Sequence, residues 1–474
     1  MAETFLEPGP TIAAAGYAIS PPMATEMARI KKLSPGGTRL LRQILAVVPD
    51  DPAARFGRLA LSPLLIGFAG WLFQRARADG IGTLYFLSRE GRVIKDVYDA
   101  LYPAAVTGIE TRYLFASRRL VRLTQFHHPH DVAAAAEGAI IGTTPATWLD
   151  ARFGVARDEI DRAALRFNGF SGPDAVIAGS GAHARLAALA YDLSDMIINR
   201  AAERRALLWS YLCDAGLNAA PAGIVDIGYG GSVQRAYSAL SGQAHRGYYM
   251  LTSPRADAAT TAGYLAAQTP LHAASPGICR YRHIYETLLC APEDSVGGLL
   301  RIPGSWQPLP QPIADCPTRQ KFVTAAHAGA VAVAQELALW RPPGADAIAP
   351  EISTCLLDTI LRAPTHADAA LIGQLGFDDL FADGAMMPLA GGNGIIPIWQ
   401  EGAAALGVSW SPTSPADDIP WPMRLLAGMA EPIVRRFGSD RDAAQFRQNP
   451  AGFVAALRDA RYRRLGRLLF GGPE

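Results

Sequence analysis

The sequence predicts an α/β fold: a Rossmann-like, mostly parallel sheet with a helical insertion, followed by a largely helical C-terminal region. Two strand–turn–helix units predict this class. The apolar stretch "TLYFLS" precedes the helix-period stretch "GRVIKDVYDALYP", and "AGIVDIGYGGSVQRAYSAL" has the same order further along the chain. Strands that alternate with helices favour a parallel sheet, because each parallel connection needs a crossover.

The N-terminal part divides into two segments. Residues 1–40 are predicted to form an irregular arm, since their first 35 positions are rich in Pro, Gly and Ala. From 38 to 78 the pattern is helical, and "SPLLIGFAGWLF" is apolar on nearly every side, which predicts a buried helix. This stretch is shorter than the about 20 apolar residues that cross a bilayer.

The remaining chain forms two predicted regions. Residues 41–310 make the α/β core, with further strands at 111–117 and 246–253 and a helical insertion at 131–218. Residues 311–474 are mostly helical, with Pro/Gly-rich segments interspersed. The length of 474 residues is sufficient for two or three domains with large cores.

Composition narrows the class of protein. Lys plus Arg number 44 and Asp plus Glu 43, a balance that argues against a nucleic-acid binder. The five cysteines lack CxxC pairing, so neither a disulfide framework nor a zinc site is expected, and a cytoplasmic location fits best. The start of the chain has no signal-peptide pattern. The basic, amphipathic stretch at 453–470 favours a helix docked on the protein, with peripheral contact to an anionic membrane as the alternative.

The stretch "IVDIGYGGS" carries the strongest local signal. A strand ends at Asp226, and Gly228, Gly230 and Gly231 lead into a helix near Ser232. Glycines permit close backbone approach, and a helix N-terminus offers unpaired N–H groups, so the turn resembles a phosphate-binding loop. Ser232 could add a hydroxyl donor and is also expected to cap the helix. The spacing matches neither GxxxxGK[ST] nor GxGxxG. The alternative is a tight structural turn.

Arginines follow two other predicted strands. In "SREG", Arg89 can grip a phosphate with two parallel hydrogen bonds, although a surface Arg89–Glu90 pair worth about 0–1 kcal/mol is the alternative. "ASRRLVRL" places Arg118 and Arg119 after the next strand. Because the carboxyl ends of parallel strands share one edge of the sheet, these arginines and Asp226 are expected to converge on a polyanionic ligand.

Acidic residues further on are candidates for proton transfer or metal binding. In "HIYETLLCAPEDSVGGL", Glu286 and Glu293 could serve as a general base or bind Mg²⁺, which usually needs one or two carboxylates plus substrate phosphates. A helix end with a solvated acidic loop is the alternative. No serine lies in GxSxG and no aspartate in DxDxT. The role of Glu90 is left open.

Several of these blocks together resemble a known family. "YFLSREG", "YLFASRR", "VDIGYGGSVQ", "GYYM", "ETLLCAPEDS" and "APTHADAALIGQLGF" are similar to the glycan phosphoribosyltransferase module of bacterial polysaccharide ribofuranosyltransferases. The resemblance implies transfer of 5-phosphoribose from 5-phosphoribosyl-1-diphosphate (PRPP) to a hydroxyl of a growing, lipid-linked glycan, with inversion, in O-antigen or capsule synthesis. Many members carry a fused haloacid-dehalogenase-type phosphatase, whose signature this sequence does not show, so a separate phosphatase is the expected partner. No organic cofactor is expected.

Residue roles follow from the resemblance taken with the turns. The loop at 228–232 is assigned to the 5-phosphate, and the arginines to the diphosphate. Asp226 is the first candidate for the general base, and Glu286 or Glu293 the second. The expected donor-binding residues are Ser88, Arg89, Glu90, Gly91, Ser117, Arg118, Arg119, Gly228, Tyr229, Gly230, Gly231, Ser232 and Gln234.

Other functions stay open at this point. One is a glycosyltransferase with a nucleotide-sugar donor, although the sequence reveals no aromatic slot for a base. Another is a non-catalytic, glycan-binding scaffold of the same pathway, which has no need for polar groups at strand ends. The expected place of action is the cytoplasm, at the inner face of the cytoplasmic membrane.

Overall fold

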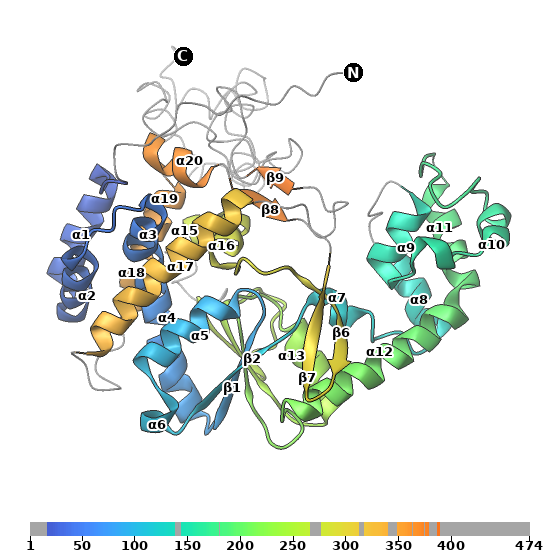
Figure 1. Ribbon diagram of the computed structural model, residues 1–474, viewed down its shortest axis with the longest axis horizontal. Coiled ribbons are helices and arrows are strands. Elements are labelled where there is room, and N and C mark those ends of the chain that lie inside the picture. Colours follow the sequence, from blue (N-terminus) through green and yellow to red (C-terminus); the bar gives the residue numbers. More distant parts are fainter. Residues whose placement is uncertain are drawn as a thin grey trace, which may run out of the picture.

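A five-stranded, entirely parallel sheet forms the centre of the protein (Figure 1). This confirms the α/β class. The strand order is β2-β1-β3-β4-β5. The strands are β1 (Thr83–Leu87), β2 (Glu110–Leu114), β3 (Gly223–Asp226), β4 (Arg246–Leu251) and β5 (Thr261–Leu265). The computed structural model describes residues 17–137, 144–179, 181–265, 276–311, 317–339, 348–362, 364–373, 375–378 and 386–388.

Helices cover both faces of this sheet, which explains why β1 is buried along most of its length. Leu84 and Phe86 contact the core shared with α4 (Ser62–Ala78), α5 (Gly91–Leu101) and α17 (Pro317–Ala338). Tyr85 and Leu87 point to the other face, where α12 (Ser194–Asp214) and α13 (Ser232–Ser241) pack. Successive strand residues alternate between faces, so an unbroken apolar strand requires both layers.

The order of the strands reverses between β1 and β3. β1 pairs with β2 on one side and with β3 on the other, with Phe86 opposite Val225. Crossovers therefore leave these two strands in opposite directions along the sheet. In sheets with this order, the carboxyl ends of the two strands are where ligands bind.

Part of the irregular arm predicted for residues 1–40 is helical, and residues 1–16 lie outside the described residues. Ser20 caps α1 (Pro21–Leu33), and Ser34 caps α2 (Pro35–Ala46). Pro21, Pro22 and Pro35 occupy the first turns of these helices, where a missing N–H has no cost. Met23, Met27 and Ile30 are buried, so α1 belongs to the main core.

The predicted apolar helix lies within the protein. It runs through α3 (Pro52–Phe56), η1 (Gly57–Leu61) and α4. By length and composition the span Pro52–Ala78 could cross a membrane, yet 94% of its apolar window is buried against other parts of the chain. The apolar side chains of this span therefore pack in the main core of the protein.

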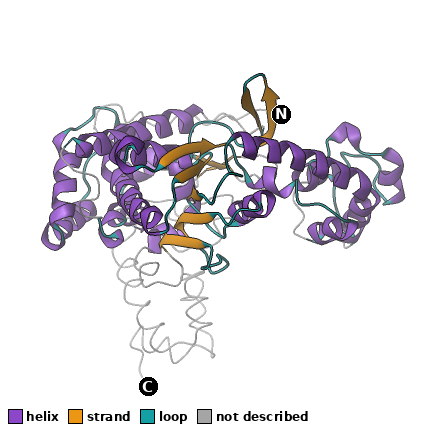
Figure 2. Ribbon diagram, turned by 90° about the horizontal axis from the view of Figure 1, so that it is seen from below, coloured by secondary structure: helices purple, strands orange, loops and turns teal. Residues whose placement is uncertain are grey.

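The helical insertion predicted at 131–218 forms a lobe beside the sheet (Figures 1 and 2). The lobe has a core of its own, which includes Trp148, Phe153 and Leu186. α12 runs from this lobe to the face of the sheet. The other elements of the lobe are α8 (Pro129–Ala136), α9 (Pro145–Phe153), η2 (Arg157–Glu159), α10 (Arg162–Phe167) and α11 (Ala182–Asp192). Two short helices flank β2 in the chain, α6 (Ala104–Thr107) before it and α7 (Arg118–Arg122) after it.

Two antiparallel hairpins and β5 were not predicted. Trp306 of the first hairpin donates a hydrogen bond to Asp214 at 2.9 Å, which fixes the hairpin to the end of α12. The expected helical character after residue 310 is seen in α17 to α20, while the segments 389–423 and 453–470 lie outside the described residues. The remaining elements are α15 (Pro276–Arg280), α16 (Arg282–Leu289), β6 (Val296–Ile302), β7 (Ser305–Pro310), α18 (Pro350–Ser353), α19 (Cys355–Arg362), α20 (His366–Ile372), β8 (Gly376–Asp378) and β9 (Met386–Pro388).

Candidate functional site

The turn after β1 is fastened to the loop after β2. Ser88 Oγ donates to the Ala116 carbonyl at 2.9 Å and accepts from the Ala116 N–H at 2.9 Å. Gly91 opens α5, and a Cβ there would lie 2.9 Å from the Phe86 carbonyl carbon. Ser88 and Gly91 therefore shape the turn that presents Arg89 and Glu90.

The glycine-rich loop after β3 is fastened to the end of β4. A Cβ on Gly228 would lie 2.6 Å from the Leu251 carbonyl oxygen, and the Ser253 N–H donates to the Tyr229 carbonyl at 2.9 Å. Gly231 has φ +74° and occupies the N-cap of α13. The expectation that Ser232 caps this helix is wrong, since Ser232 is its first residue and no side chain caps it. The first N–H groups of α13 thus lack a side-chain acceptor.

Asp226 is the half-buried end of β3, and several charges surround it. Its Oδ1 accepts from the Ile227 N–H at 2.7 Å. Burial, reinforced by the charges of Glu90 and Glu286, raises the pKa of Asp226 to about 8, while Arg118 and the Ile227 N–H oppose the shift. The turn after β1, α7 and α16 therefore each bring a charge close to this carboxyl.

Buried tyrosines form the other surroundings of Asp226. Tyr285 of α16, Tyr237 of α13 and Tyr249 of β4 have raised pKa values, caused first by burial and also by the Asp226 charge. Tyr249 lies directly opposite Asp226 in the strand register. Within the described part of the chain, the hydroxyls of Tyr285 and Tyr237 have no hydrogen-bond partner. The sequence offered no signal for these tyrosines, because each is an ordinary core residue of its element.

The two neighbouring arginines of α7 face different parts of the protein. Arg118 is exposed, acts electrostatically on Asp226, and makes no hydrogen bond or ion pair with the residues described. Arg119 instead pairs with Asp150 of α9, at 2.7 Å to Oδ1 and 2.8 Å to the carbonyl. The structure thus brings Arg118 to Asp226 and directs Arg119 to the helical lobe.

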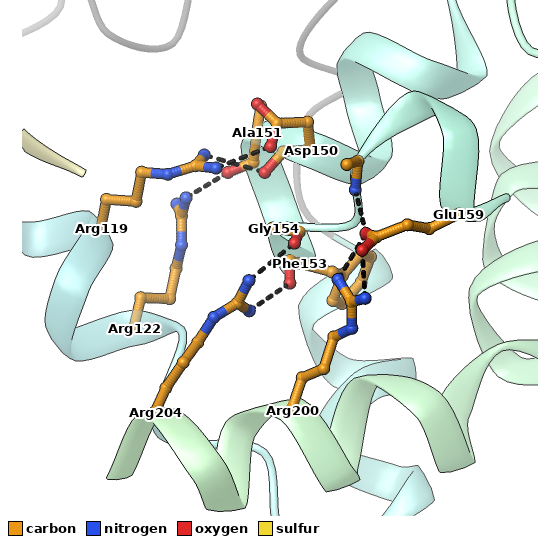
Figure 3. A network of polar contacts seen from close by, with 10 residues as sticks. Arg119, Arg122, Asp150, Ala151, Phe153, Gly154, Glu159, Arg200 and Arg204 are labelled. Carbon is orange, nitrogen blue, oxygen red and sulfur yellow. Dashed lines mark hydrogen bonds and ion pairs between the residues drawn. The ribbon is translucent and has the colours of Figure 1, made fainter. Parts of the chain in front are cut away.

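Figure 3 shows the contacts of Arg119 and its neighbours with the end of α9. Arg119, Arg122 and Arg204 all donate to carbonyls at the C-terminal end of α9, a partially negative helix end. Burial, together with the charges of Arg119 and Arg152, lowers the pKa of Arg122 to about 10. Arg119 therefore belongs to the joint between α7 and the lobe.

Arg89 and Glu90 both lie partly buried near the Cys290 thiol. The Arg89 N–H donates to Glu90 Oε2 at 3.1 Å. The Glu90 charge also contributes to the raised pKa values of Asp226, Tyr113 and Cys290. Glu90 is therefore placed among the charged groups of this region.

The two predicted glutamates differ in their surroundings. Glu286 acts on Asp226 and Tyr285. Glu293 accepts a hydrogen bond from the Tyr113 hydroxyl. The Arg92 guanidinium lies 3.5 Å from Glu293 Oε2 and 3.7 Å from the centre of the Tyr113 ring. Glu293 thus interacts with Tyr113 of β2 and Arg92 of α5. Glu286 instead acts on the Asp226 carboxyl.

The remaining predicted donor residues have local structural contacts. Ser117 caps α7 by accepting from the Leu120 N–H at 2.9 Å, and it donates to the Val296 carbonyl at 2.6 Å. Gln234 is buried, and its Nε2 donates to the His245 carbonyl at 2.6 Å. The Gly230 carbonyl accepts from Arg235, and Tyr229 packs against the main core. The contacts of these residues therefore position the loops.

Metal binding and known relatives add little to this description. Among the residues described, no group of three or more His, Cys, Asp or Glu side chains is placed to hold a metal ion. No protein-family model matches the chain, and no curated protein matches its sequence.

Proposed function

We propose that the protein is an inverting, PRPP-dependent glycan phosphoribosyltransferase built on a Rossmann-like sheet. The observation that carries the proposal is the reversal of strand order between β1 and β3, which joins the Arg89 turn, Asp226 and the glycine-rich loop at one edge. Two anion-binding elements on either side of a carboxyl suit a donor with a phosphate at each end of a ribose.

The donor is bound by groups of different kinds. The 5-phosphate binds at the N-terminus of α13, where the first N–H groups have no side-chain cap. The diphosphate binds Arg118 and Arg89, whose planar guanidinium groups match phosphate oxygens. The positive charges stabilise the negative charge that develops on the leaving diphosphate. An Mg²⁺ ion, if required, would depend on substrate phosphates and one or two of the carboxylates Glu90, Asp226 and Glu286.

The reaction is a displacement at the anomeric carbon of the ribose. The acceptor hydroxyl oxygen forms a bond to this carbon as the bond to the diphosphate oxygen breaks, and the bonding electrons leave with pyrophosphate. Asp226 accepts the proton of the hydroxyl. A pKa of about 8 keeps this carboxyl near the pH at which a base is both available and strong.

The product retains the 5-phosphate, so a separate phosphatase must remove it to leave a ribofuranosyl residue. The acceptor is a hydroxyl on a growing surface polysaccharide, an O-antigen or capsule, carried on a lipid. This acceptor assigns the reaction to the inner face of the cytoplasmic membrane.

The test is acceptor-dependent release of pyrophosphate. Purified protein is incubated with PRPP and a panel of lipid-linked or synthetic glycans, and pyrophosphate and the glycan product are measured. We expect both to appear with wild type and to vanish in Asp226→Asn. A nucleotide sugar that raises the melting temperature where PRPP does not would establish the nucleotide-sugar alternative. Binding of glycan without any transfer would favour a scaffold.

A further inference from the structure

Arg319, which is not among the site residues predicted from the sequence, is a buried arginine at the start of a long helix. Arg319 lies in the first turn of α17, and only 7% of its surface is exposed. The first turn of this 22-residue helix contains no acidic residue. A cation there faces the positive end of the helix dipole, which is an unfavourable position for it.

Among the described residues, Arg319 has little to compensate its charge. Its sole hydrogen-bond partner among the described residues is the Cys290 thiol. Burial raises the pKa of Cys290 to about 12, so the thiol is neutral and supplies no counter-charge. Burial also lowers the pKa of the neighbouring His327 to about 4, and its Nε2 donates to the Leu288 carbonyl at 2.9 Å. A buried guanidinium without a paired anion is costly.

Cys290 locates Arg319 relative to the candidate site. This cysteine is the C-cap of α16, the helix that carries Glu286 and Tyr285. Its thiol responds to the charges of Glu90, Arg89 and Arg319. Glu90 is the carboxylate of this neighbourhood, and no ion pair joins it to Arg319 in the described ranges. Arg319 and the turn after β1 therefore both lie close to the Cys290 thiol.

We propose that Arg319 is a further ligand of the donor diphosphate, acting beside Arg89 across the Cys290 thiol. This inference rests on the proposed function, and it assigns the pyrophosphate end of PRPP to the junction of β1, α16 and α17. The bound anion supplies the counter-charge that the described residues lack at the start of α17. Arginine suits this position because its planar donors can bridge two phosphate oxygens.

Calorimetric titration of the full chain with two probes tests the inference. Inorganic pyrophosphate reports on the diphosphate end, and ribose 5-phosphate reports on the loop at 228–232. We expect Arg319→Gln to weaken pyrophosphate binding at least about tenfold, the loss typical of a charge-assisted hydrogen bond, and to leave ribose 5-phosphate binding unchanged. Arg319→Lys should lie between Arg319→Gln and wild type.

The matched control is Arg301→Gln, since the Arg301 side chain is 63% exposed on the β6–β7 hairpin. It should bind both probes as wild type does. Unfolding midpoints without ligand identify a variant that fails to fold, and Arg319→Lys then decides the question. Wild-type pyrophosphate affinity in a folded Arg319 variant overturns the inference alone. An Arg319-dependent pyrophosphate site in a protein that transfers nothing from PRPP overturns the proposed function alone. Wild type that binds no pyrophosphate overturns both.

Discussion

Glu90, in the turn after β1, and Asp226, at the end of β3, lie close enough for the charge of Glu90 to raise the pKa of Asp226. After burial, the Glu90 charge is the largest cause of the shift. Arg118 acts on the same carboxyl in the opposite direction. The protonation of Asp226 is therefore set by residues from three separate elements, and each can be changed on its own.

The pH profile of transfer should report Asp226. If Asp226 is the base, kcat/KM rises with pH to a limb near pH 8, the pKa of this carboxyl in the free protein. Glu90→Gln removes a negative charge and should move the limb to lower pH by about one unit or more. The control is Glu110→Gln, because Glu110 is exposed and lies at the start of β2, whereas the candidate site lies at the carboxyl ends of the strands. An unchanged limb in Glu90→Gln would contradict the assignment.

Asp226 should also make stability depend on pH. Its pKa is about 8 in the folded state and near 3.8 when unfolded, so the folded state retains a proton that the unfolded chain loses. This contribution is complete below about pH 4 and is lost as the pH rises through about 8. Asp226→Asn cannot ionise, and its amide oxygen can still accept from the Ile227 N–H. Its stability relative to wild type should therefore increase between about pH 4 and 8 and level off above, as measured by urea denaturation.

The neighbours Arg118 and Arg119 should differ in what their loss affects. Arg118→Gln is expected to weaken PRPP binding roughly tenfold and to raise the pH of the Asp226 limb, because a favourable positive charge is removed. Arg119→Gln breaks contacts with Asp150 and should mainly lower the free energy of unfolding, by about 1 kcal/mol. Titration with PRPP and urea denaturation of both variants separate the two effects. If Arg119→Gln weakened PRPP binding and Arg118→Gln affected only stability, Arg119 would be the ligand of the diphosphate.

Gly228 should be far less tolerant of substitution than Gly230. A Cβ at Gly228 meets the Leu251 carbonyl oxygen at 2.6 Å, whereas the nearest atom to a Cβ at Gly230 is 3.7 Å away. Gly228→Ala is expected to destabilise the protein by about 1–3 kcal/mol. Gly230→Ala should stay within about 0.5 kcal/mol. Equal unfolding free energies for the two variants would mean that the loop is not held against β4.

Three of the four strands that the sequence predicted share a physical feature. β1, β3 and β4 are apolar runs buried along most of their length, so their pattern does not depend on which neighbours they meet. The fourth, β2, is an edge strand whose residues alternate between more and less exposed positions, which is also a strand pattern. β5 was missed because its five residues include Thr261 and Gly263. The β6–β7 hairpin contains glycines and prolines that weaken a strand pattern.

The candidate site could be predicted only in part, for a related reason. Asp226 and Glu90 converge because parallel strands bring their carboxyl ends together, whatever the side chains do next. Arg118 and Arg119 could not be told apart, since successive residues of a helix point about 100° from each other and the direction of α7 was unknown. Arg319 depends on how α17 packs against α16, and no local pattern reports that.

The short helix α7 has contacts on two sides that affect how the protein can move. Its Arg119 and Arg122 hold the end of α9, while Arg118, one position earlier, faces Asp226. A rotation of the lobe would therefore carry Arg118 along and change the electrostatic field at Asp226. A molecule that binds the lobe and tilts it would therefore change the pKa of Asp226, although Asp226 lies in another part of the fold.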